Sequence, residues 1–251
     1  MTGGERPADW DEQWRLTAMD LAAPDEEAQT PRWRAQQRIV QERLGGFAGL
    51  KAIEIGAGRG LNGVLYAEQG ANVTLLDVSA YPLEQAGPLF ESRGLAFEAV
   101  VADAFALPDE LRGAFDVSMS FGLCEHFLGE RRRAIVAAHV ELLRPGGIAF
   151  IGVPNRRDPV YRLWMAALKR SGSWPFGTEE PYTAGELASL ARAAGGDPLP
   201  PAYGSFAATV VSHGINQLLY KAGRGGLPVR HVPLPFVDRF GYELLLPIVR
   251  R

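Results

Sequence analysis

The 251-residue sequence predicts an open α/β fold, in which helices cover both faces of a mostly parallel sheet. From about residue 51, short strand-like runs alternate with stretches of helical periodicity. The first run leads into a glycine-rich turn, "GAGRG", of the kind that connects a strand to a helix. With 47% hydrophobic residues the chain can bury one large core, so we predict a single domain over residues 1–251.

The predicted elements follow one another in a regular order. The strands are "KAIEIG", "NVTLLDVS", "LAFEAVVAD", "FDVSMSF" and "GIAFIGVPN". Helices are predicted after the first strand, through "LNGVLYAEQG", and after the second, from about Pro82 to Arg93. A third helix covers "GERRRAIVAAHVELLRPGG", where Leu142 and Leu143 lie on the apolar stripe and Pro-Gly-Gly ends the helix.

The two ends of the chain depart from this alternation, and we expect them to form a lid over a core at residues 47–155. Residues 1–46 carry three tryptophans in amphipathic helical patterns, with Thr30 and Pro31 as cap and first helical residue. Residues 156–251 hold an inserted helix in "DPVYRLWMAALKRSGSWPF" and the rest of the sheet. A further helix, "TAGELASLARAAGG", opens with the capping box Thr183 and Glu186.

Composition and charge restrict the partners. The formal net charge of −3 supplies no global positive field for a nucleic-acid backbone. The chain has one cysteine, Cys124, no signal-peptide pattern at its start, and no apolar run long enough to span a bilayer. We therefore expect a cytoplasmic protein with a small-molecule substrate and with no nucleic-acid or membrane partner.

The spacing of the glycines separates two classes of cofactor site. The fingerprint of dinucleotide-binding enzymes is G-x-G-x-x-G, but position 61 is Leu61, and the pattern here is G-x-G-x-G with Glu54 two residues ahead. This argues against a nicotinamide-dependent oxidoreductase. An oxidoreductase stays open as an alternative. A non-catalytic binding module that retains the cofactor-binding loop is another.

Two acidic residues follow successive strands. Asp77 ends the second strand, where a carboxylate can accept hydrogen bonds from both hydroxyls of a ribose. Asp103 ends the third strand and is well placed for the exocyclic amine of an adenine. Together the two carboxylates suggest a site for an adenosine group.

In this order and spacing, "EIGAGRG", "LLDVS", "VADAFALP", "FDVSMSFGLCEHF" and "LLRPGGIAFIGVPN" resemble class I S-adenosylmethionine-dependent methyltransferases. The resemblance covers roughly residues 47–155, and the final "GYELLLPIVRR" resembles the last strand of that fold. It implies a Rossmann-like, doubly wound sheet of seven strands, mostly parallel with an antiparallel last strand. It also implies S-adenosyl-L-methionine as cofactor and S-adenosyl-L-homocysteine as product.

The resemblance assigns a role to each matching position. The methionine portion of the cofactor would be wrapped by Gly56, Ala57, Gly58 and Gly60, while Glu54 would fix either this loop or the amino group. Asp77 would hold the ribose, and Val78 would lie against the adenine. The adenine edge would be read by Asp103 and Ala104, and the sulfonium would lie beside Phe121 and Gly122.

Methyl transfer needs alignment of nucleophile, methyl group and sulfur, and a protein base mainly when the acceptor is a hydroxyl. "CEHF" supplies candidates: we assign His126 as base or substrate contact, because histidine titrates near neutral pH, and Glu125 as its partner. Both residues could instead be structural. We predict O-methylation of a small molecule in a biosynthetic pathway, with N- or C-methylation as the alternative.

The region after the fifth strand supplies candidate acceptor contacts. We assign substrate binding to Tyr161, Trp164, Tyr182 and His213, although aromatic residues in this region could equally pack the lid against the sheet. No group of His, Asp or Glu has plausible metal-ligand spacing beyond the cofactor site, so we predict no metal.

Overall fold

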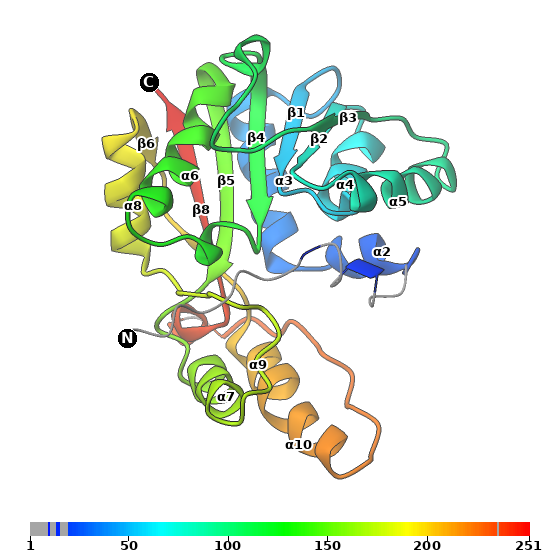
Figure 1. Cartoon of the computed structure of the whole chain (residues 1–251), viewed down its shortest axis with the longest axis vertical. Helices are drawn as coiled ribbons and strands as arrows, with labels where there is room; N and C mark the ends of the chain where they lie inside the picture. The colour runs from blue at the N-terminus through cyan, green and yellow to red at the C-terminus, as the bar shows by residue number, and fades with distance from the viewer. Residues whose placement is uncertain (1–9, 11–13, 16–19, 235) are drawn as a thin grey trace.

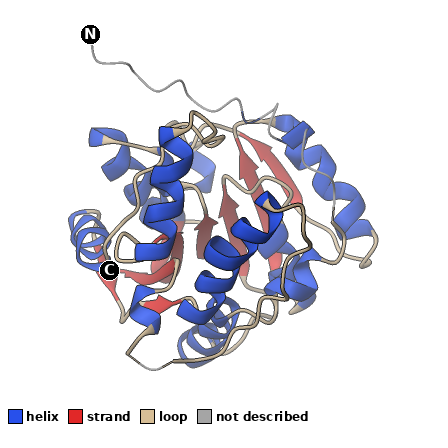
Figure 2. Cartoon of the chain, turned by 90° about the horizontal axis from the view of Figure 1, so that it is seen from below, coloured by secondary structure: helices blue, strands red, loops and turns tan. Residues whose placement is uncertain are grey.

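The computed structural model describes residues 10, 14–15, 20–234 and 236–251, and the fold is a mixed sheet between two groups of helices (Figures 1 and 2). The sheet order is β3-β2-β1-β4-β5-β8-β6, and β7 also pairs with β8. Strands one to five run parallel, and β8 is antiparallel to β5. The strands are β1 (Lys51–Ile55), β2 (Asn72–Asp77), β3 (Glu98–Val101), β4 (Phe115–Phe121), β5 (Leu143–Pro154), β6 (Gly196–Pro198), β7 (Ala202–Tyr203) and β8 (Glu243–Arg250).

Strand β1 is buried on both faces because helices cover both sides of the sheet. Ala52 packs into a cluster with Trp33 and Tyr66, whereas Ile53 and Ile55 pack into a separate cluster on the opposite face. The first face is covered by α3 (Pro31–Leu44), α4 (Leu61–Glu68) and α5 (Ala80–Glu91); the second by α6 (Gly129–Leu142) and α8 (Ala184–Ala193). This alternation of side chains is the period of two expected for a strand.

The prediction of a doubly wound sheet with an antiparallel last strand is confirmed, but seven strands was wrong, since the sheet has eight. The short strands β6 and β7 add three and two residues, both paired with β8. Segments this short carry no recognisable alternation. The predicted Pro-Gly-Gly stop also differs: α6 ends at Leu142, and "LRPGG" already belongs to β5.

The N-terminal part of the chain contributes to the body of the fold. Helix α2 (Ala23–Glu27) is followed by α3, where Thr30 accepts a hydrogen bond from the Trp33 amide at 3.1 Å and Pro31 is the first helical residue, as predicted. Trp33 is buried against Phe47 and Tyr66. The predicted helical patterns at Trp10 and Trp14 fall mostly outside the described residues.

Beyond the carboxyl ends of the parallel strands, a helical group projects from the lower end of the molecule in Figure 1. It consists of α7 (Pro159–Arg170), α9 (Phe206–Thr209), the π-helix η3 (Val210–Ile215) and α10 (Asn216–Lys221). One half of the predicted capping box is present: Thr183 accepts a hydrogen bond from the Glu186 amide at 3.2 Å at the start of α8, whereas the Glu186 carboxylate pairs with Arg132 and Arg156. Within the described residues, no helix is long and apolar enough to cross a membrane.

Candidate functional site

The loop between β1 and α4 passes three times through the left-handed backbone region. Gly56, Gly58 and Gly60 have φ of 60°, 52° and 71°. A Cβ at Gly56 would lie 2.6 Å from Leu123 Cδ1, and one at Gly60 would lie 2.5 Å from Leu75 Cδ1. Glycine alone suits both the backbone and the available space. The loop therefore brings main-chain atoms to the carboxyl edge of the sheet, where a ligand can approach closely.

Glu54 is buried at the end of β1 and braces the start of α4. Its Oε2 accepts a hydrogen bond from the Gly63 amide at 2.8 Å, and its Oε1 accepts one from Asn62 Nδ2 at 3.3 Å. Burial raises the pKa of Glu54 to about 7, although these hydrogen bonds act to lower it. Of the two roles that we left open for Glu54, the geometry favours fixing the loop.

Asp77 connects the glycine loop to the end of β2. Its Oδ2 accepts a hydrogen bond from the Gly58 amide at 2.9 Å, and its Oδ1 accepts one from the Ser79 amide at 2.9 Å. Each carboxylate oxygen can accept more than one hydrogen bond, so these two contacts are compatible with a hydrogen bond from a ligand. The side chain is held in place before any ligand binds.

The remaining adenosine candidates lie along the same edge, because β1, β2 and β3 are neighbouring parallel strands. Val78 follows Asp77 and is 66% exposed, so it offers an apolar surface. Asp103 is exposed after β3, where its Oδ1 accepts the Phe105 amide at 2.9 Å, and Ala104 beside it is half-buried. The structure thus brings the predicted adenosine contacts together.

At the end of β4, Phe121 lies beneath a cation that the sequence analysis missed. The Arg32 guanidinium of α3 lies 4.4 Å from the centre of the Phe121 ring and pairs with both Glu27 and Glu243. Burial acts to lower the pKa of Arg32, but the two carboxylates outweigh it and raise that pKa. Through its pair with Glu243, Arg32 connects helix α3 to the last strand beside the site. The two residues are 211 positions apart in the sequence.

Glu125, in the 3-10 helix η2 (Cys124–His126), is 2% exposed, and its carboxyl group lies beside the end of β4. A Cβ placed on Gly122 would be 3.7 Å from Glu125 Oε1. Glu125 Oε2 has no hydrogen-bond partner within the part of the chain that the structure describes. Burial raises the pKa of Glu125 to about 8, and the nearby Glu179 carboxylate adds to the shift.

His126 is oriented by the backbone. Its Nδ1 lies 2.8 Å from the Thr178 carbonyl oxygen, so Nδ1 is the donor, and the Trp10 ring meets the imidazole edge-on at 4.8 Å. Burial lowers the pKa of His126, while its hydrogen bonds to backbone carbonyls act to raise it. With Nδ1 occupied, only Nε2 remains to accept a proton.

Three of the four predicted acceptor contacts form one cluster beside Glu179. The His213 ring lies 5.3 Å from that of Tyr161 and 5.2 Å from that of Trp164. The Tyr161 hydroxyl donates a hydrogen bond to Glu179. Tyr242, which the sequence analysis did not single out, completes the cluster at 4.5 Å from the Tyr161 ring. Burial lowers the pKa of His213 to about 4, so its imidazole is neutral at physiological pH.

Tyr182 lies apart from this cluster. It is fully buried, its hydroxyl donates to the Cys124 carbonyl at 3.2 Å, and the Arg132 guanidinium lies 3.3 Å from its ring centre. Tyr182 thus stabilises η2 through the Cys124 carbonyl, which favours a structural role over the substrate contact that we expected.

The described N-terminal residues lie over the glycine loop. Arg59 donates a hydrogen bond to the Trp14 carbonyl at 2.9 Å, and its guanidinium lies 5.3 Å from the Trp14 ring centre. The Trp14 ring is so close to the loop that a Cβ at Gly58 would be 2.3 Å from Trp14 Cζ2. Arg15 lies over the Tyr81 ring at the start of α5. These contacts put Trp14 over the glycine loop of the predicted cofactor site.

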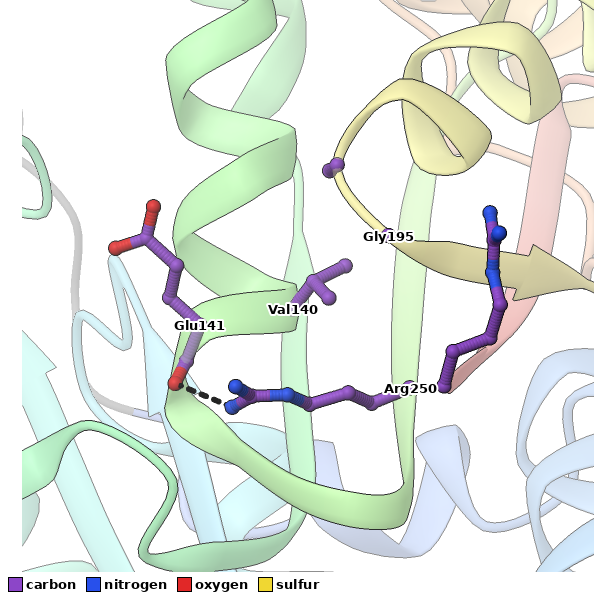
Figure 3. Close-up of a pocket in the computed structure, with 6 residues that line it drawn as sticks. Val140, Glu141, Gly195 and Arg250 are labelled. Carbon is purple, nitrogen blue, oxygen red and sulfur yellow. Dashed lines mark hydrogen bonds between the residues drawn. The ribbon is translucent and has the colours of Figure 1, made fainter.

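A cavity of about 280 Å³ lies at the opposite edge of the sheet, between the ends of α6, α8 and β8 (Figure 3). Its wall includes Arg250, which donates a hydrogen bond to the Glu141 carbonyl at 3.0 Å. Arg251 donates likewise to the Arg192 carbonyl at 3.2 Å. Both guanidinium groups satisfy carbonyls at helix ends, which is a structural use. In the described ranges, no three or more His, Cys, Asp or Glu residues are grouped so that they could hold a metal ion.

Comparison with known proteins gives one family match and several partial likenesses. Residues 52–147 match the family model described as a methyltransferase domain. Over 129 residues the chain is 32% identical to a ubiquinone biosynthesis O-methyltransferase of Cronobacter sakazakii, and the match covers 51% of each protein. The chain therefore spans about half the length of the curated relatives that it matches.

Several solved structures are similar over nearly the whole chain. Magnesium protoporphyrin IX methyltransferase of Synechocystis PCC 6803, crystallised with bound SAH, superposes with a TM-score of 0.62 at 14% identity, covering 96% of this chain and 93% of that one. The 1,6-didemethyltoxoflavin-N1-methyltransferase of Burkholderia thailandensis gives 0.57 at 20% identity, with coverage of 96% and 82%. These likenesses confirm the predicted fold class.

Proposed function

We propose that this chain, which has the class I S-adenosylmethionine-dependent methyltransferase fold and a methyltransferase domain over residues 52–147, methylates a small-molecule acceptor in a biosynthetic pathway. The observation that carries the proposal is the hydrogen bond from the Gly58 amide to Asp77, which holds loop and carboxylate together at the carboxyl edge. The O-methyltransferases among the relatives support a hydroxyl as the acceptor group.

The residues at this edge fit S-adenosyl-L-methionine. Gly56, Gly58 and Gly60 carry no side chains of their own, so the main chain of the loop can approach the methionine portion closely. Asp77 places a carboxylate at the end of β2, where it can accept hydrogen bonds from the ribose hydroxyls. The exposed Val78 offers an apolar face to the adenine, and Asp103 follows the neighbouring strand. The bound cofactor would supply a methyl group on a positively charged sulfur, beside Phe121 and Gly122.

A hydroxyl acceptor has to lose its proton as the new carbon–oxygen bond forms and the carbon–sulfur bond breaks. The geometry favours Glu125 over His126 for this step, which reverses the order that we predicted. Glu125 Oε2 is unpartnered among the described residues and the carboxyl group lies beside the end of β4, whereas burial lowers the pKa of His126 and makes its imidazole a weaker base. In this proposal Glu125 takes the proton, and His126 holds the backbone around η2 in position.

The aromatic cluster of Tyr161, Trp164, His213 and Tyr242 is the proposed wall of the acceptor site. Planar aromatic surfaces suit a flat or aromatic acceptor. An amine acceptor is the second candidate, because Glu125 and Glu179 are two buried carboxyl groups that interact electrostatically beside these rings. N-methylation would use the same cofactor site.

Calorimetric titration tests the cofactor first. We expect S-adenosylhomocysteine to bind and NADPH to give no heat, and the reverse result would establish the oxidoreductase alternative. Incubation with methyl-labelled S-adenosylmethionine and panels of phenols and of amines then tests the reaction. Labelled phenol ethers support O-methylation, labelled amines support the second candidate, and binding without any labelled product supports a non-catalytic module.

A further inference from the structure

The helical group beyond the carboxyl edge has a charge opposite to that of the rest of the protein. Residues 159–178 and 198–234 contain six Lys or Arg residues and no Asp or Glu, in a chain whose formal net charge is −3. The six are Arg162, Lys169, Arg170, Lys221, Arg224 and Arg230. We call these two segments the basic lid. The acidic residues that border the first segment and contact α7, Asp158 and Glu179, are buried, so the two segments present only positive charge at their surface.

The two segments form one body. Helix α7 of the first segment packs against η3 of the second, where Val160 approaches Gly214. After α10 the chain turns back, and the side chain of Asn216 holds Leu227 by two hydrogen bonds of 2.7 and 2.9 Å to its amide and carbonyl. In Figure 1 this body projects beyond the sheet, so its outer surface is available to a large partner.

The basic lid also exposes large apolar side chains. Leu163 on α7 is 73% exposed, and Leu218 and Tyr220 on α10 are 70% and 57% exposed. Leu227 and Val229, in the segment that follows α10, are 49% and 43% exposed. Monomeric proteins rarely leave so many large apolar side chains together in water without a partner.

Exposed cations and exposed apolar residues are neighbours in the sequence of the basic lid. Arg162 and Leu163 are adjacent exposed residues, as are Tyr220 and Lys221, and Val229 and Arg230. Every residue from 221 to 230 is exposed. A surface of this composition lets apolar side chains enter the boundary between lipid headgroups and acyl chains while the cations contact phosphate.

We propose that the basic lid docks the protein peripherally on an anionic lipid surface. A second copy of this chain is a poorer partner, since two lids without acidic residues would repel each other at the contact. We expected no membrane partner because the sequence has no spanning run, but a peripheral contact requires none. Helix α7 carries both Leu163 and the proposed acceptor contacts Tyr161 and Trp164, so docking would bring the bilayer close to the acceptor site.

Vesicle flotation tests the proposal without any reference to methyl transfer. Vesicles of phosphatidylcholine alone are compared with an equimolar mixture of phosphatidylcholine and phosphatidylglycerol. The full chain should float with the anionic vesicles only, and added NaCl should release it. Equal binding to both compositions, or no binding to either, overturns the proposal.

Charge-reversal variants locate the surface. The combined variant Lys221→Glu, Arg224→Glu and Arg230→Glu should lower affinity for anionic vesicles by about a hundredfold or more. The matched control, Arg43→Glu, Arg133→Glu and Arg192→Glu, changes the net charge equally at exposed positions outside the lid and should bind like the wild type. Leu218→Ser should weaken binding while leaving its dependence on salt. Equal losses in test and control variants contradict the proposal.

Far-ultraviolet circular dichroism and the thermal midpoint of each variant verify that the fold is intact. Sedimentation velocity of the wild type and of the lid variant measures whether the basic lid mediates a dimer. A dimer of the wild type that the lid variant abolishes, combined with no flotation, would assign the surface to a second copy and overturn lipid docking.

Discussion

The backbone amide of Gly58 lies 2.9 Å from Asp77 Oδ2, and this hydrogen bond joins the loop after β1 to the end of β2. Both groups lie at the carboxyl edge of the sheet. Open α/β sheets bind their ligands at this edge, through main-chain and side-chain atoms of the loops that follow the strands. The amides of Gly58 and Ser79 already orient the Asp77 side chain. Ligand binding therefore costs little conformational entropy at Asp77.

Asp77→Ala removes this acceptor. We expect the affinity for S-adenosylhomocysteine to fall by about 1.5 to 3 kcal/mol for each charge-assisted hydrogen bond lost, as measured by calorimetry. The control is Asp197→Ala, which removes an exposed carboxylate paired with Arg251 at the opposite edge and should leave the affinity unchanged. An Asp77→Ala protein with wild-type affinity would show that this residue does not hold the cofactor.

Gly58→Val introduces a branched side chain at φ +52°, where its Cβ would meet the Trp14 ring at 2.3 Å. We expect cofactor binding to be abolished, because the backbone and the space both exclude the new side chain. Gly87→Ala is the control, since a Cβ there meets nothing within 4 Å. Adding Trp14→Ala to Gly58→Val removes the clash with the ring but not the backbone strain, so we expect cofactor binding to stay lost. Full recovery of binding would mean that the clash with Trp14, and not the backbone, caused the loss.

The pH dependence of turnover distinguishes the two base candidates. A base works in its unprotonated form, so turnover should rise with pH through the pKa of the residue that accepts the proton. If that residue is Glu125, the rise centres near pH 8; if it is His126, the rise lies below 6.5, because burial lowers that pKa. We expect the higher midpoint, measured at saturating cofactor with a hydroxyl acceptor.

Substitution of Glu125 completes this test. Glu125→Gln should lower turnover by about a hundredfold to ten-thousandfold and leave cofactor affinity almost unchanged. It should also remove the rise of turnover with pH near pH 8, which we call the limb of the pH profile. His126→Ala should cost less and keep the limb. A His126→Ala enzyme that loses the limb while Glu125→Gln retains it would restore the order that the sequence suggested.

Arg32→Met should destabilise the protein by about 3 kcal/mol, because it leaves Glu27 and Glu243 largely buried without their cation. Urea unfolding followed by circular dichroism measures the change. Arg38→Ala on the same helix breaks an exposed pair with Glu42 and should alter stability by less than about 1 kcal/mol. Equal effects of the two substitutions would mean that the Arg32 ion pairs do not stabilise the fold.

Features that depend on residues close together in the chain could be predicted from the sequence. Strand-like runs alternating with helices fixed the parallel core, glycines at alternate positions marked the turn after β1, and the residue that ends β2 was recognisable as Asp77. Local signals such as the Thr30 cap were equally readable. Each of these has a period or a spacing that backbone geometry imposes within a few residues.

Features that join distant segments arise only when the chain has folded. No spacing rule connects Arg32 with Glu243, or separates Tyr161 in the aromatic cluster from Tyr182 behind η2. Burial, which only packing creates, distinguishes Glu125 from its neighbour His126 by raising one pKa and lowering the other. Strand β7 escaped prediction because two residues carry no period, and its pairing with β8 exists only once the chain has folded.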